Sequence, residues 1–186
     1  MATPPVFSAG AVLTAAQMNK IGMWFITSAT AANTSTTLGI NSCFSSDYVN
    51  YVIYWNGKAA NNDVSLSLKL RASGTPVSTG YRYVTQQQYV GIGAIGLGGS
   101  NSATLISLGS ISSTETFYTM TIANPYAALP TYVFADGVNN QTAFSNGIDA
   151  YKSQGFLQNT TSYDGFEIIS GGGNLTGTLY VYGCRV

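Results

Sequence analysis

Apolar and polar residues alternate with a period of two in several stretches of this chain, which is the pattern of β-strands that bury one face. In "DVSLSLKLRA", Val64, Leu66, Leu68 and Leu70 fall on one face, and the serines and cations between them fall on the other. "FYTMTIANP" alternates in the same way and ends at an Asn-Pro turn signal. A third run, "TGTLYVYGCRV", closes the chain. These runs predict a protein built mainly of strands.

Further strands are predicted from short apolar stretches between turn signals. The full set is expected at Met23–Ala29, Thr36–Gly39, Tyr51–Asn56, Ser65–Leu70, Tyr81–Gln87, Tyr89–Gly93, Ala103–Ser107, Phe117–Ile122, Thr131–Ala135, Ser153–Leu157, Phe166–Ser170 and Thr178–Gly183. Segments such as "NGKAANND", "GLGGSNS" and "DGVNNQ" separate them as turns. Turn signals that recur this often are typical of sandwiches and barrels. We therefore expect an all-β fold, an antiparallel jelly-roll-like β-sandwich.

Residues 1–22 have a different pattern, which predicts an extended N-terminal arm followed by one short helix. Pro4 and Pro5 restrict φ and favour extended geometry in their neighbours. Thr14 stands three residues before Gln17, the spacing of a capping box, and Gly22 is a candidate C-cap. The chain is thus divided into an arm and short helix at 1–22 and a β-sandwich body at 23–186.

The segment "VFSAGAVLTAAQMNKIG", residues 6–22, resembles the N-terminal signature of small tailed-bacteriophage virion proteins of the minor tail or decoration type. The resemblance is most specific between Pro5 and Phe25. It implies a structural protein that is assembled in the host cytoplasm and carried on the exterior of the phage particle.

The composition argues against charged partners. Lys plus Arg and Asp plus Glu are balanced at 7 each, and charged residues make up 8% of the chain against about a quarter in ordinary domains. Net charge therefore attracts neither nucleic acid nor anionic lipid, and no apolar run approaches the roughly 20 residues that span a membrane. Low charge with 45% hydrophobic residues suits a chain that covers its surface with copies of itself or with neighbouring proteins.

The chain has no histidine, which removes the commonest general base and the histidine-containing catalytic triads. Two carboxylates remain a possible pair for a glycosidase. However, Asp47, Asp63, Asp136 and Asp164 stand in turn sequences, where aspartate bonds its own backbone. Asp164 and Glu167 are three residues apart, a spacing that puts them on opposite faces of a strand. We expect no enzyme, and no cofactor or metal.

Two further motifs carry little chemistry. "GIGAIG" at residues 91–96 matches a dinucleotide-binding pattern by letter, but "LGGSNSATL" follows it and no helix is expected there to hold a pyrophosphate. We interpret it as a glycine-rich loop in which backbones approach closely. Cys43 and Cys184 are expected to be free thiols, with a bridge between the first and last strands as the alternative.

The main functional hypothesis is a capsid decoration or cement protein whose arm lies across a neighbouring capsomer. Partner-interface residues are then expected in the arm and at the start of the body: Pro4, Pro5, Val6, Phe7, Val12, Leu13, Met18, Met23 and Phe25. Trp55 is a further contact candidate or a core residue, while Ile21, Trp24 and Ile53 are expected in the core. The partners would be the major capsid protein, or tail proteins, and further copies in a dimer or trimer.

The alternative hypothesis is a minor tail protein or a tail-fibre tip that binds a receptor glycan. Aromatic rings flanked by amide side chains bind sugars well, and the candidate loops are "NPYAALPTY" and "SGGGNLTG". A chain of this kind lacks the heptads or repeats of a fibre shaft, so this hypothesis ranks second. A glycan depolymerase is the remote third, because no histidine is present and the carboxylates stand in turns.

Overall fold

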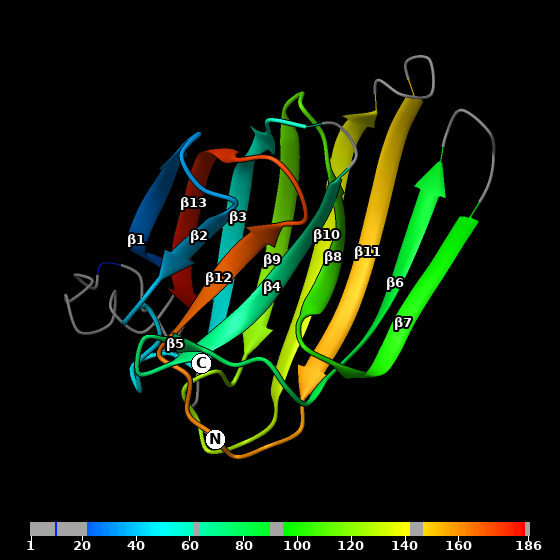
Figure 1. The fold of residues 1–186 in the computed structure, drawn as a ribbon. Helices are drawn as coiled ribbons and strands as arrows, with labels where there is room; N and C mark the ends of the chain where they lie inside the picture. The colour runs from blue at the N-terminus through cyan, green and yellow to red at the C-terminus, as the bar shows by residue number, and fades with distance from the viewer. Residues whose placement is uncertain (1–9, 11–21, 62–63, 90–94, 142–146, 185–186) are drawn as a thin grey trace.

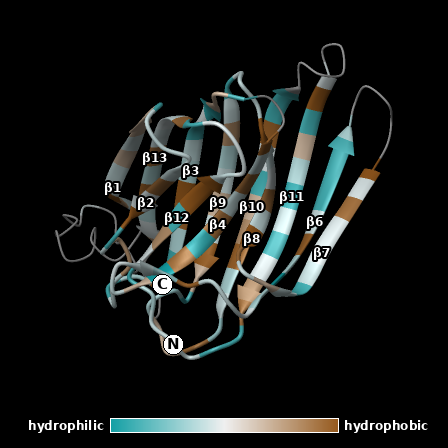
Figure 2. Ribbon diagram, in the orientation of Figure 1, coloured by the Kyte–Doolittle hydropathy of each residue, from teal (hydrophilic) through white to brown (hydrophobic). Residues whose placement is uncertain are grey.

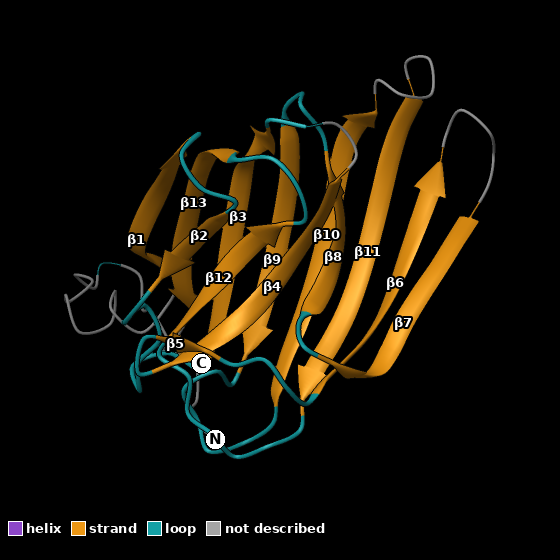
Figure 3. Cartoon of the chain, viewed as in Figure 1, coloured by secondary structure: helices purple, strands orange, loops and turns teal. Residues whose placement is uncertain are grey.

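The computed structural model describes residue 10 and residues 22–61, 64–89, 95–141 and 147–184. Within these ranges the chain forms strands and no helix (Figure 3). The strands are β1 (Met23–Ala32), β2 (Thr37–Ile40), β3 (Asn50–Ala59), β4 (Val64–Ala72), β5 (Thr75–Pro76), β6 (Tyr81–Tyr89), β7 (Ile95–Ala103), β8 (Ile106–Ile111), β9 (Thr116–Ala123), β10 (Thr131–Gln141), β11 (Gly147–Leu157), β12 (Gly165–Ser170) and β13 (Leu175–Cys184).

Two antiparallel sheets of unequal size face each other. The larger has eight strands in the order β1-β13-β3-β9-β10-β11-β6-β7, and the smaller has five, β2-β12-β4-β5 with β8 beside β4. Figure 1 shows the smaller sheet in front of the larger one, with the β6–β7 hairpin extending beyond it on the right. This confirms an all-β, antiparallel, sandwich-like fold. The arrangement does not confirm a jelly roll, which joins eight strands in two Greek keys.

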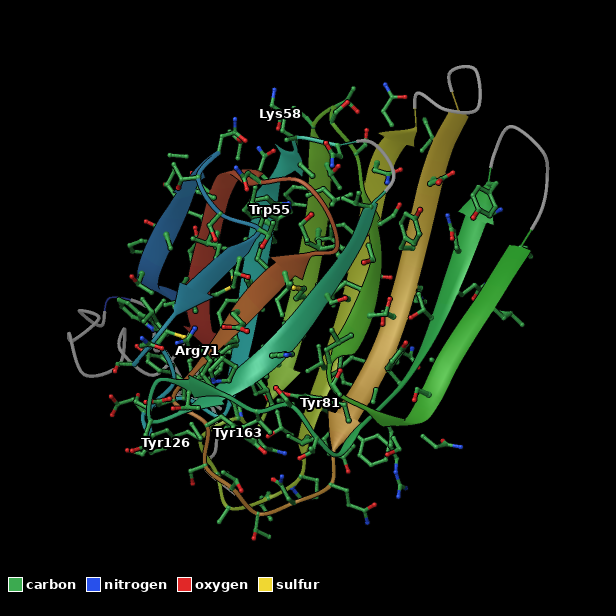
Figure 4. All side chains as sticks on the ribbon, viewed as in Figure 1. Trp55, Lys58, Arg71, Tyr81, Tyr126 and Tyr163 are labelled. Atoms are coloured by element: carbon green, nitrogen blue, oxygen red, sulfur yellow. The ribbon has the colours of Figure 1, made fainter. Side chains whose placement is uncertain are left out.

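The core lies between the sheets and follows the alternation read from the sequence. Leu66, Leu68 and Leu70 of β4 are fully buried, as "DVSLSLKLRA" predicts, and they pack with Ile53 and Trp55 of β3. Figure 4 shows the Trp55 side chain between the two sheets. Trp55 therefore belongs to the core and is not available for a contact between subunits, whereas Trp24 is only half-buried.

One ion pair links two strands of the smaller sheet. Arg71 Nη1 donates to Glu167 Oε2 at 2.7 Å, and both side chains are largely buried. Arg71 Nη2 also donates to the carbonyl of Gly74, which ties the β4–β5 turn to β12. The Glu167 carboxylate therefore has a structural role, because it holds β12 to β4. Figure 4 places Arg71 at the lower end of the sandwich.

The sequence failed to predict the short strand β5, the whole of β7 and parts of several other strands. Residues 96–102, "GLGGSNS", were expected as a turn but lie in β7, because the backbone of this edge strand pairs with β6 whatever its side chains. "DGVNNQ" was expected as a turn but continues β10, where Asp136 pairs with Lys152 across the sheet. Gly137 is required there because the ring of Tyr118 covers its Cα. The prediction that Asp136 caps a turn was therefore wrong.

Other expectations have mixed outcomes. Asp47 lies in a turn, as expected, but here the Ser45 hydroxyl accepts from the Asp47 amide and donates to the Asp47 carboxylate; Asp164 lies in the loop before β12. Asp63 lies outside the described residues, as do 91–94 of the "GIGAIG" segment and the predicted helix. Both cysteines are free thiols, which confirms the first alternative. Burial raises the pKa of the Cys43 thiol to about 12, so this thiol is an inert core group.

Candidate functional site

The predicted partner interface is described only at its C-terminal end. Pro4, Pro5, Val6, Phe7, Val12, Leu13 and Met18 lie outside the described residues. Met23 and Phe25 of β1 are described and are 46% and 59% exposed. The Phe25 ring meets the ring of Tyr182 on β13 edge-on, with centroids 5.6 Å apart. The two residues are therefore accessible, and their role in an interface stays a prediction.

Phe25 is one end of an aromatic row on the outer face of the eight-stranded sheet, the face turned away from the smaller sheet. Tyr182 also contacts Tyr54 of β3, with ring centroids 5.7 Å apart, and Tyr54 stacks on Phe117 of β9 at 6.0 Å. The row thus crosses β1, β13, β3 and β9, which are neighbours in the sheet. Cross-strand aromatic pairs of this kind stabilise a sheet, but these rings remain partly open to solvent.

The same face continues across β10, β11 and β6 with further apolar side chains. Tyr132 stacks on Phe156 at 6.0 Å, and the Arg82 guanidinium lies 5.8 Å from the centre of the Phe156 ring. With Phe134 and Val84 they line a shallow groove of about 400 Å³. We call the whole surface the outer face. Its exposed large apolar residues include Phe25, Val84, Phe117, Tyr132, Phe134, Val138, Ile148 and Tyr180.

The inner face of the same sheet changes from apolar to polar toward β11 and β6. Here β8 has a neighbouring strand, β4, on only one side. Along the other edge of β8, side chains of the larger sheet donate to the β8 carbonyl oxygens. Tyr118 OH donates to Ser110 O at 2.7 Å, and Thr85 Oγ1 and Ser153 Oγ donate to Ser107 O. The buried hydroxyls therefore cover the open edge of β8. Figure 2 shows β6 largely hydrophilic, in contrast to β12.

Beside this edge lies a second hollow, which we call the polar cleft. It measures about 390 Å³ and opens between the β6–β7 hairpin and β8. Its side-chain lining includes Tyr83, Thr85 and Gln87 of β6, and Ser110 and Tyr151 from β8 and β11, while Gly96 and Gly98 of β7 line it with backbone. All of these side chains are uncharged, so the lining presents hydroxyl, amide and aromatic groups.

Asp149 anchors the polar side chains of the cleft. Its carboxylate is buried, and Oδ2 accepts hydrogen bonds from Tyr151 OH at 3.0 Å and from Gln87 Nε2 at 3.2 Å. Gln87 Nε2 also lies 2.6 Å from Tyr151 OH, which in turn is 2.5 Å from Ser110 Oγ. Burial raises the pKa of Tyr151, and the negative charge of Asp149 adds to the effect. Tyr151 therefore keeps its proton and donates near neutral pH.

Little in the sequence points to this cluster. Asp149 is one of the seven carboxylates and does not stand in a turn signal, but the members of the cluster come from three strands, β6, β8 and β11, that are far apart in the sequence. No residue of the candidate glycan loops at 124–132 and 170–177 lines the polar cleft. Among the described residues, no group of three or more His, Cys, Asp and Glu side chains could hold a metal ion. The described part of the chain also contains no helix that could cross a membrane.

The comparisons with known proteins found little. No protein-family model matches the chain, and the search of curated proteins returned no match. Among solved structures, the CBM2 module of the evolved Dit of Lactobacillus casei BL23 phage J-1 is 11% identical, with 86% of this chain and 69% of that chain covered, at a TM-score of 0.25.

Proposed function

We propose that this chain is a non-enzymatic structural protein of a bacteriophage particle. The observation that carries the proposal is the outer face, where aromatic and aliphatic side chains are exposed along most of an eight-stranded sheet. Apolar patches of this extent are typical of surfaces that bind other proteins. The resemblance of residues 6–22 to small phage virion proteins supports the same function.

Within the particle, we propose a decoration or cement role on the capsid exterior. The arm would bind the major capsid protein, and the outer face would pack against a second copy. Aromatic residues supply most of the energy at such interfaces, and the balanced charge of the chain avoids repulsion between copies. No step of this role requires catalysis.

Antibody labelling of intact particles tests the location. A cement protein is expected over the whole capsid surface, and its removal is expected to lower the resistance of the capsid to heat or low salt. Labelling confined to the tail would contradict the cement role.

Deletion of residues 1–8 tests the arm. We expect the shortened protein to keep its folded body, because every described strand lies after residue 22, and to be lost from particles. Circular dichroism checks the fold, and quantitative blotting of purified particles measures incorporation. Full incorporation of the shortened protein would contradict the role of the arm.

A second candidate function is a minor tail protein or fibre tip that binds a glycan. The specific observation in its favour is the polar cleft, whose uncharged hydroxyl and amide groups differ in character from the outer face. Free protein that blocks infection would support this candidate.

A further inference from the structure

We propose that the polar cleft binds a neutral saccharide. The inference deepens the second candidate function above, and it is independent of what the outer face binds. A volume of about 390 Å³ falls within the range of about 300–1,000 Å³ typical of small-ligand sites. Three features of the cleft favour such a ligand: empty space over β7, a fixed set of polar atoms, and the absence of charge in the lining.

The first part is the space over β7. Gly98 lies opposite Thr85, and Gly96 lies opposite Gln87, so both glycines turn the same face toward the cleft as these β6 residues. A Cβ built on Gly98 would meet nothing within 4 Å, and one on Gly96 would meet nothing closer than 3.8 Å. Side chains would therefore fit at both positions. Their absence leaves a bare stretch of backbone along the cleft, where a ligand can approach.

The second part is the polar set, which is held in place before any ligand arrives. Asp149 and Ser110 fix the Tyr151 hydroxyl from two sides, and Asp149 also fixes the Gln87 amide through Nε2. Because Nε2 is engaged, Gln87 Oε1 is left as an acceptor that no described residue occupies. A sugar hydroxyl can donate to this acceptor, which the Tyr151, Asp149 and Ser110 network holds in a fixed position.

The third part is charge. No cation is among the residues that line the cleft, so a phosphate or carboxylate ligand would have no cationic partner there. The buried carboxylate of Asp149 stands directly behind Tyr151 and Gln87 and would repel an anion. The Tyr83 ring gives an apolar border for the C–H face of a sugar ring. A neutral sugar therefore fits better than an acidic one.

Titration calorimetry of the full chain with a panel of neutral di- and trisaccharides of glucose, galactose, mannose, rhamnose and N-acetylglucosamine tests the inference. At least one is expected to bind, and sialylated and sulfated analogues of the same sugar are expected to bind at least tenfold more weakly. Binding by none of the neutral sugars, or tighter binding of the anionic ones, would overturn it.

Two variants locate the binding. Gly98→Val should fill the cleft and abolish binding, while valine suits a strand and the added Cβ has open space, so the fold should be kept. Gln87→Leu should weaken binding about tenfold, the effect of one lost hydrogen bond. Gln88→Leu is the matched control, because Gln88 is the next residue on β6 but is exposed and lies outside the cleft. Wild-type affinity in both Gly98→Val and Gln87→Leu would also overturn the inference, without bearing on the virion role.

Discussion

At the scale of single residues, the interior contains several protonated groups that the folded state prevents from ionising. Cys43 is the clearest of them, since burial raises the pKa of its thiol from 9.0 to about 12. Burial also raises the pKa of the core tyrosines Tyr81, Tyr118 and Tyr151. The protein is therefore expected to lose stability in alkali.

The direction of this pH dependence follows from the coupling between proton binding and folding. An unfolded chain loses the Cys43 proton near pH 9, whereas the folded chain keeps it to about pH 12, so stability is complete below pH 9 and falls between these values. A difference of about three pKa units between the unfolded and folded chain lowers the free energy of unfolding by at most about 4 kcal/mol. The tyrosines add their own loss of stability above about pH 10. Urea unfolding followed by tryptophan fluorescence, in steps from about pH 8 to about pH 11, measures the decline.

Cys43→Ala tests the assignment to this thiol. The variant is less stable at neutral pH because a core side chain is shortened, but its stability should decline less steeply between about pH 9 and pH 10. Cys184→Ala makes the same change at the half-buried thiol and should keep the wild-type slope. An equal slope in wild type and Cys43→Ala would show that the Cys43 thiol does not contribute.

At the scale of elements, the strands that the sequence predicted well are those whose environment is set by side-chain burial. β4 is an example, because its leucines face the core and its polar residues face outward. β7 could not be predicted in this way: it is an edge strand of glycine and serine whose place depends on backbone pairing with β6. The polar cleft was missed for the same reason, since β7 and the pairing of distant strands create it.

The open edge of β8 yields a prediction at this scale. Tyr118 OH donates to Ser110 O on that edge, and the tyrosine side chain is fully buried. Tyr118→Phe removes the hydroxyl group that donates to the Ser110 carbonyl, and we expect a loss of about 1–2 kcal/mol in the free energy of unfolding. Urea denaturation measures it. Tyr180→Phe is the control, because Tyr180 is on the outer face and 40% exposed, and it should cost well under 1 kcal/mol.

At the scale of the whole molecule, the two sheets differ in size, and the outer face of the larger one is the main surface left for a partner. Eight strands about 4.8 Å apart, of about ten residues each, make a face of roughly 1,000 Å². A stable interface needs about 800 Å² from each partner. The outer face is thus large enough for a dimer that pairs the same surface on both copies.

The composition pointed to such contacts through its low charge, but it did not say where they lie. The alternation of each strand gives its two faces, and only the pairing of β9, β10 and β11 in one sheet shows that Phe117, Phe134 and Ile148 share a surface. Of the interface residues singled out from the sequence, Phe25 lies on this surface, where it continues the aromatic row through Tyr182.

Charge substitution on this surface tests the dimer. Phe134→Lys and Val138→Lys each place a cation at the middle of the outer face, where the wild-type side chains are 45% and 49% exposed. Burial of an unpaired charge is costly, so each variant is expected to weaken self-association at least tenfold, as measured by sedimentation equilibrium over a range of concentrations. The side chains are already exposed to solvent in the monomer, so thermal unfolding should change little.

Leu129→Lys provides the control, because Leu129 is 54% exposed but lies in the loop between β9 and β10, away from the outer face. This variant should associate as the wild type does. If Leu129→Lys alone weakens self-association, the contact between copies involves the loop at 124–130. Association that none of the three changes affects would place it on another part of the chain, with the arm at residues 1–22 as the next segment to remove.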